Sequence, residues 1–102
     1  MRLLNAIPTL ALLVYAGHAT ANEALARKND CMGCHAVATQ VVGPAYKDVA
    51  ARYKGDPEAV AKLMKSIREG SSGSWGQLAM PPHPKLSEAD LRKLATWVLG
   101  TQ

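Results

Sequence analysis

The chain has 102 residues, with 12 basic and 8 acidic side chains and 48% hydrophobic residues but no phenylalanine. This length suits one small domain. The weak positive charge is spread along the chain and forms no run, which excludes the basic patch of a nucleic-acid-binding protein, so we expect no nucleic acid among the partners.

The N-terminal segment has the pattern of an export signal. Arg2 precedes an apolar stretch centred on residues 10–16, and Ala19-Thr20-Ala21 fits the small-x-small rule of signal peptidase. An uncleaved membrane anchor is the competing interpretation, but the apolar core is only about ten residues long, too short to span a bilayer comfortably. We expect residues 1–21 to be a cleaved signal peptide and residues 22–102 to be one periplasmic domain.

The expected domain is small enough to need additional stabilisation. Without Arg2 and the rest of the signal, its 81 residues carry eleven basic and eight acidic side chains, a formal charge of +3. Its two cysteines, Cys31 and Cys34, are too close in sequence for a disulfide between them to stabilise much. A large bound cofactor would stabilise the domain better and would fill a centre that has few aromatic side chains.

Short helices separated by Gly- and Pro-rich loops are predicted, the first over about residues 22–30 and a weaker second one over about residues 46–53. The third helix begins with Asp56 as N-cap and Pro57 at its first position, and it ends at Gly70.

The last helix opens with a capping box at Ser87-Glu88-Ala89-Asp90 and ends before Gly100. Apolar residues recur at helical spacing in both later helices: Val60, Leu63, Met64 and Ile67 in the third, and Leu91, Leu94, Ala95 and Val98 in the last. No segment alternates like a strand, so the fold class is all-α. The irregular stretch between these helices, Gly70 to Leu86, is long enough to suggest a functional loop.

The motif Cys31-Met32-Gly33-Cys34-His35 is the attachment sequence for haem c. A thioredoxin-like dithiol would lie among alternating strands and helices, and the sequence predicts no strand. A structural zinc site would require the adjacent Cys34 and His35 to bind one tetrahedral ion together. We therefore predict one haem c, attached through thioethers at Cys31 and Cys34, with His35 as the proximal iron ligand.

A second axial ligand is needed if the iron only transfers electrons. Met32 lies inside the attachment motif, and Met64 lies on the apolar stripe of the third helix, where methionine usually fills the core. Met80 lies in the irregular stretch and is followed by Pro81-Pro82, which stiffens the backbone. We predict Met80 as the ligand, and His83 remains the alternative.

Five segments, in order, resemble the small bacterial class I monohaem cytochromes c of the c-551/c-552 kind. They are CMGCH at 31–35, VVGPAYKDVA at 41–50, GSSGSWG at 70–76, MPP at 80–82 and ATWVL at 95–99. The resemblance spans nearly all of residues 22–102. It implies a small class I cytochrome c fold: about four short helices wrapped around one covalently bound haem c, with the first and last helices crossing and one haem edge exposed.

The resemblance also implies two further cofactor-binding residues. At Pro44 the backbone carbonyl would accept a hydrogen bond from His35, which orients the ring and raises its basicity. The indole of Trp75 would donate a hydrogen bond to a haem propionate. Tyr46 and Trp97 are expected to be packing residues.

The sequence departs from the family pattern at three positions. Ser66 stands where relatives often carry a basic residue that pairs with a propionate, so this contact would be absent or supplied by Lys65 or Arg68. His83 replaces an asparagine whose amide helps to hold the methionine loop, and Ala79 replaces a proline. These two changes affect the rigidity of the loop and the reduction potential.

An iron bound on both sides has no open position for substrate, so we predict an electron carrier and not an enzyme. A haem-based ligand sensor or a peroxidase-like enzyme is the alternative if Met80 is readily displaced. Redox partners such as a nitrite reductase, a terminal oxidase, a peroxidase or a membrane quinol-oxidising complex would dock briefly with a monomer. They would bind at the exposed haem edge, framed by Cys31, Val41, Val42 and Met80.

Overall fold

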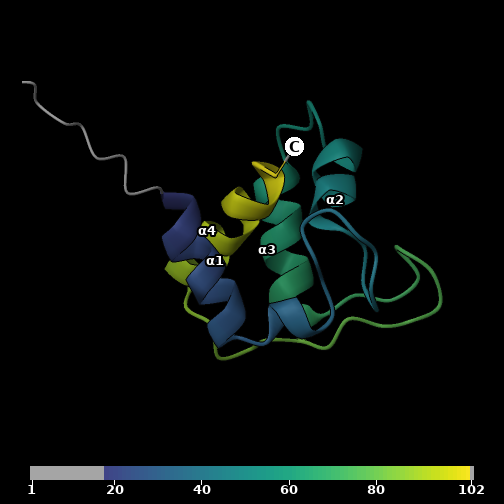
Figure 1. Cartoon of the computed structure of the whole chain (residues 1–102), viewed down its shortest axis with the longest axis horizontal. Coiled ribbons are helices and arrows are strands. Elements are labelled where there is room, and N and C mark those ends of the chain that lie inside the picture. The colour runs from purple at the N-terminus through teal and green to yellow at the C-terminus, as the bar shows by residue number, and fades with distance from the viewer. Residues whose placement is uncertain (1–17, 102) are drawn as a thin grey trace, which may run out of the picture.

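Within the residues that the structure describes, five helical elements follow one another, joined by irregular loops (Figure 1). They are α1 (His18–Lys28), the 3₁₀ turn η1 (Cys31–Gly33), α2 (Tyr46–Arg52), α3 (Ala59–Glu69) and α4 (Glu88–Leu99). The computed structural model describes residues 18–101, and within them no β-strand forms. The predicted all-α class is therefore confirmed. Most of the predicted signal peptide, residues 1–17, lies outside the described residues.

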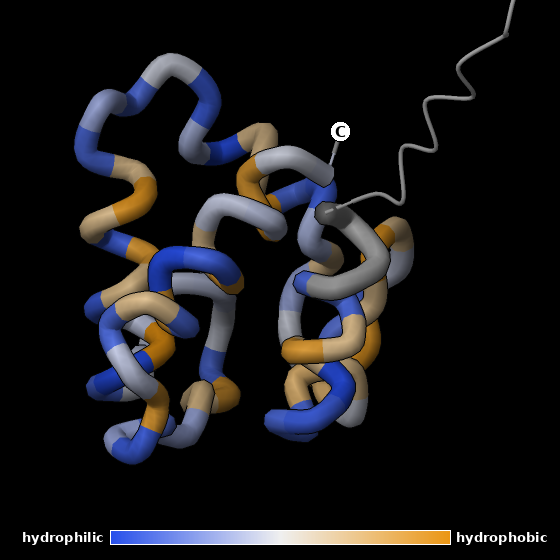
Figure 2. The backbone as a smooth tube through the Cα atoms, turned by 90° about the vertical axis from the view of Figure 1, so that its left-hand side faces the viewer, coloured by the Kyte–Doolittle hydropathy of each residue, from blue (hydrophilic) through white to orange (hydrophobic). Residues whose placement is uncertain are grey.

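The last helix, α4, is the centre of the fold, because α1, α2 and α3 all pack against it (Figure 1). Its predicted inner face is buried, and it consists of Leu91, Leu94, Ala95 and Val98. Burying a leucine or valine side chain of this kind stabilises the fold by roughly 1.5–3 kcal/mol. Figure 2 shows the resulting alternation of hydrophobic and hydrophilic residues along the helical turns. As predicted, the Ser87 hydroxyl caps α4 by accepting a hydrogen bond from the Asp90 backbone N–H, at 3.1 Å.

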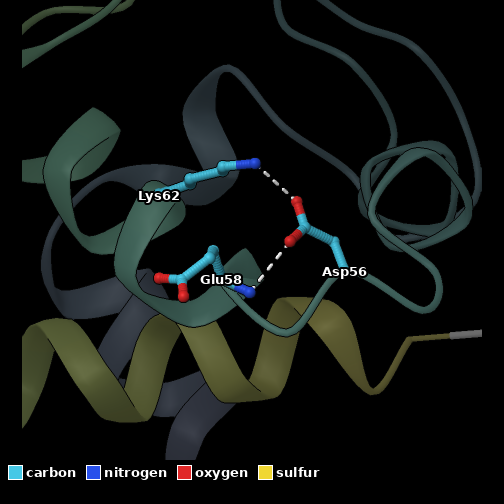
Figure 3. Close-up of polar contacts among 3 residues, drawn as sticks. All are labelled: Asp56, Glu58 and Lys62. Carbon is cyan, nitrogen blue, oxygen red and sulfur yellow. Dashed lines mark hydrogen bonds and ion pairs between the residues drawn. The ribbon is translucent and has the colours of Figure 1, made fainter.

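The third helix begins at Ala59, two residues later than predicted. Asp56 still forms hydrogen bonds just before this helix. Its carboxylate accepts the backbone N–H of Glu58 at 2.8 Å and the Nζ–H of Lys62 at 2.7 Å (Figure 3). The carboxylate thus closes a turn ahead of α3 and is not the helix N-cap. Lys62 and the Glu58 N–H hold the pKa of the exposed Asp56 carboxyl below its usual value.

The first helix ends at Lys28, about two residues before the end of the predicted helix, and the cysteine motif does not continue it. The helix ends because both the backbone N–H and the side-chain amide of Asn29 donate to the carbonyl of Leu25, at 3.2 and 2.9 Å. Asp30 then takes a left-handed conformation with φ of 60°, which turns the chain into η1. At its other end α1 begins at His18, four residues before the start of the predicted helix. None of the helices in the described residues is long and apolar enough to cross a membrane.

The irregular segment between α3 and α4 is pinned at its base. Ser71 and Met80 exchange two backbone hydrogen bonds, of 3.2 and 2.8 Å, and form an isolated antiparallel bridge. Gly70 makes this approach possible, because it has a φ of 78° and a Cβ there would lie 2.6 Å from the Met80 carbonyl oxygen. Further along, the His83 N–H donates to the Ile67 carbonyl at 2.9 Å. The segment then runs on to α4 (Figure 1).

Candidate haem site

A large pocket lies between α2, α3, α4 and the loops, with about 1120 Å³ of empty space including the part open to solvent. Its lining is mostly apolar, the kind of surface against which a large apolar cofactor packs. Residues from the motif, the loops and all three helices line the pocket, among them Cys31, Cys34, His35, Val42, Pro44, Tyr46, Val49, Leu63, Ser66, Ile67, Trp75, Leu78, Met80, Leu94, Trp97 and Val98.

The His35 ring is oriented by a backbone carbonyl. Its Nδ1 lies 2.8 Å from the carbonyl oxygen of Pro44. Because a carbonyl can only accept, Nδ1 must carry the proton, and in the neutral ring the free lone pair is then on Nε2. This is the contact that the resemblance implied for Pro44. The arrangement leaves Nε2 as the nitrogen available to bind a metal.

Tyr46 and Gly43 also lie close against the His35 ring. Tyr46 stacks on it with the ring centroids 4.9 Å apart and an interplanar angle of 19°, and Trp97 meets Tyr46 edge-on at 5.1 Å. On Gly43 a Cβ would lie only 2.5 Å from the His35 Cε1 atom, so only glycine leaves room for the ring there. Burial raises the pKa of the Tyr46 phenol well above its usual value, so the ring that stacks on His35 is uncharged.

Cys31 and Cys34 are unpaired and half-buried, and both line the pocket beside His35. Burial raises the pKa of the Cys31 thiol. A redox-active dithiol needs the opposite, a thiol whose pKa is lowered so that the thiolate forms at neutral pH. The raised pKa of Cys31 therefore argues against a dithiol oxidoreductase.

The structure separates the four candidates for the second axial position. Met80 lines the same pocket as His35. Met64 is 6% exposed and belongs to the hydrophobic core, and Met32 packs against that core. His83 does not line the pocket; it borders a shallow depression with Pro84 and other residues of the following loop.

Trp75 lines the pocket and is half-buried, and its surroundings contain a residue that the sequence did not identify. The guanidinium carbon of Arg52 lies 3.3 Å from the centroid of the Trp75 ring. The contact missing at Ser66 was expected to be absent or to be supplied by Lys65 or Arg68; neither of these residues lines the pocket, and Arg52 does not line it either. No local pattern could have identified Arg52, because a helix end and a distant loop make this contact.

A helical domain that arranges a Cys-x-x-Cys-His motif at a largely apolar pocket has the features of the c-type haem proteins. The family model for cytochrome c matches residues 19–102. Cytochrome c-552 of Nitrosomonas europaea is 53% identical over 89 residues, which cover 87% of this chain and 85% of that protein. Cytochrome c-551 of Allochromatium vinosum is 46% identical over 88 residues, which cover 86% and 94%. The crystal structure of the Nitrosomonas protein matches with a TM-score of 0.76 and 49% identity, over 78% of this chain and 99% of that one.

The chain belongs to the cytochrome c family, in its small class I c-551/c-552 group. It is therefore a protein with covalently bound haem c that carries electrons between redox proteins, and it is not an enzyme.

Proposed function

We propose that the chain is a periplasmic carrier of single electrons in which Cys31 and Cys34 attach the haem and His35 and Met80 bind its iron from opposite sides. The observation that carries the proposal is that these four side chains line one pocket and that the Pro44 carbonyl leaves His35 Nε2 free to bind a metal. When bound, haem c supplies a reversible one-electron change between ferrous and ferric iron.

Three contacts would keep His35 in one orientation when haem is bound. The Pro44 carbonyl fixes the protonated nitrogen, Gly43 allows the loop to pass close to the ring, and Tyr46 packs flat on one face. A hydrogen bond from Nδ1–H also raises the basicity of Nε2 and strengthens it as a ligand.

Met80 is held by its backbone. The bridge to Ser71 fixes residue 80 on one side, and Pro81-Pro82 restricts the chain on the other. Its thioether carries no proton, so the ligand itself does not titrate, and it favours ferrous iron. Trp75, on the same wall of the pocket, has one indole N–H with which to bind a haem propionate.

An apolar surface surrounds the mouth of the pocket and suits brief docking. Val41, Val42 and Leu78 are 56%, 50% and 71% exposed, and the last two also line the pocket. Contacts of this kind are small in area, and the net positive charge would add salt-sensitive steering toward acidic partners. A nitrite reductase, a terminal oxidase, a peroxidase and a membrane quinol-oxidising complex are the partner classes that we propose.

The ligand assignment is tested with Met80→Ala, and Met64→Leu serves as a control that keeps the volume of a buried methionine. We expect Met80→Ala to remove the ferric charge-transfer band of methionine-sulfur ligation, to lower the reduction potential strongly and to let the iron bind cyanide at once. The control should keep the band and the potential. An unchanged potential in Met80→Ala would eliminate this ligand. Export is tested by the mass of the periplasmic protein, which should equal residues 22–102 plus haem; a mass that includes residues 1–21 would refute cleavage.

A further inference from the structure

Arg52 links the end of α2 to the loop that carries Trp75. Its guanidinium carbon lies 3.3 Å from the centroid of the Trp75 ring, and its Nη1 donates a hydrogen bond to the Ser74 carbonyl at 2.7 Å. A planar guanidinium can stack on an aromatic ring and donate in its own plane at the same time, whereas a lysine ammonium cannot reproduce both contacts. The pairing therefore depends on arginine specifically.

The loop has few other attachments at this point. In the part of the chain that the structure describes, residues 72–79 make no backbone-to-backbone hydrogen bond, and the bond from Arg52 to Ser74 is the one side-chain hydrogen bond that they form. The bridge between Ser71 and Met80 holds only the base of the loop. Apart from its own packing against the core, Trp75 is thus kept against the pocket wall by Arg52.

Arg52 brings a positive charge to the edge of the pocket, because it does not line the pocket itself but contacts Ser74 and Trp75, which do. No lysine, arginine, aspartate or glutamate is among the described residues that line the pocket, and Ser66, on α3, is neutral. Haem carries two propionate carboxylates, which need donors and a positive charge nearby when they are partly removed from water. Arg52 uses one of its five N–H groups on Ser74, so the others are free to face an anion.

We infer that Arg52 is a positioning residue for Trp75 and the positive counter-charge for the propionate that Trp75 binds, a contact that the sequence predicted to be either absent or supplied by Lys65 or Arg68. The inference rests on the proposed function, because it assumes a haem whose propionate meets the Trp75 indole.

The test compares the haem-loaded variants Arg52→Met and Arg52→Lys with Lys54→Met, which removes the same charge from an exposed residue two positions further along. The first readout is the solvent exchange of the Trp75 indole N–H, measured by NMR, with the Trp97 indole as internal reference. The second is the reduction potential at low and high salt. Neither readout measures electron-transfer activity.

We expect Arg52→Met to accelerate exchange of the Trp75 indole about tenfold, the size expected for losing a charge-assisted hydrogen bond and an exposed cation–π contact. It should also lower the potential more than Lys54→Met does, because a nearby positive charge disfavours ferric iron. Arg52→Lys should restore most of the potential but only part of the protection of the indole.

The inference is overturned if either effect of Arg52→Met is no larger than that of Lys54→Met, or if Trp97 exchange rises equally, which would indicate general destabilisation. Failure of the proposed function would look different. In that case the unmutated protein would lack the charge-transfer band of methionine-sulfur ligation.

Discussion

Substituting Gly43 with alanine tests how the proximal histidine is held. The new Cβ would lie 2.5 Å from the His35 Cε1 atom and 2.9 and 3.0 Å from the two ring nitrogens. Gly43 cannot easily move away, because its N–H donates to the Cys34 carbonyl at 2.7 Å and its own carbonyl accepts from Val41 at 3.2 Å. The ring must therefore give way.

The size of the effect follows from these distances. Ordinary contacts of a Cβ begin at 3.4 Å, so the ring has to move by about 0.9 Å, and its 2.8 Å bond to Pro44 can lengthen to about 3.7 Å, beyond hydrogen-bonding range. Overpacking costs about 1–3 kcal/mol, and a lost hydrogen bond costs about 0.5–1.5 kcal/mol. We expect the free energy of unfolding to fall by about 2–4 kcal/mol. The reduction potential should change as well, because His35 loses the partner that raises its basicity.

The assay is urea unfolding of the haem-loaded protein, combined with the reduction potential and NMR of the His35 ring. Gly100→Ala is the matched control, because the nearest atoms to its Cβ would be carbonyl oxygens at an ordinary 3.5 Å and its φ is −84°. This change should be neutral or stabilise by up to about 1 kcal/mol. Equal stability of Gly43→Ala and Gly100→Ala, with an unshifted histidine signal, would refute the steric argument.

Two other perturbations address attachment and charge. Cys34→Ala should give a chain that retains its haem poorly and is largely unfolded. Haem retention is measured by the absorbance that remains after denaturing gel filtration, and folding by circular dichroism. A stable, fully loaded variant would disprove the idea that covalent attachment stabilises the domain. Asp56→Asn keeps an acceptor for the Glu58 N–H but removes the charge beside Lys62. Because the pKa of Asp56 is lowered in the folded protein, the stability that it contributes is complete above the pKa of an unfolded aspartate and is lost as the pH falls through the folded pKa. Urea titrations at decreasing pH should therefore show that the free energy of unfolding falls less steeply in the variant. An identical pH profile would contradict this.

The sequence was most informative where a local pattern determines the structure. The spacing of Leu91, Leu94 and Val98 predicted the buried face of α4, and the order of Cys31, Cys34 and His35 predicted the cofactor, because both depend only on near neighbours in the chain. The same patterns misplaced the ends of α1 and α3, since a side-chain amide and a turn closed by Asp56 decide those ends.

The walls of the site depend on contacts between distant segments and could not be predicted in this way. Arg52 meets Trp75 across two loops and a helix, and no periodicity records this pairing. The role of Gly43 as the only residue type that fits beside His35 becomes visible only once the loop is folded against the ring. The position of His83 away from the pocket likewise follows from its backbone bond to Ile67, which the composition of the loop does not reveal.

The bridge between Ser71 and Met80 lets the first part of the long loop vary without shifting residue 80. Because the backbone of Met80 itself makes the bridge, the eight residues between these two positions form a closed excursion whose length costs little entropy to change. Substitutions of the exposed Leu78 side chain should therefore alter which partner is recognised while leaving the iron ligand in register. Changes at Ser74 or Trp75, in the same excursion, would also disturb the contacts with Arg52 and so act on the redox centre.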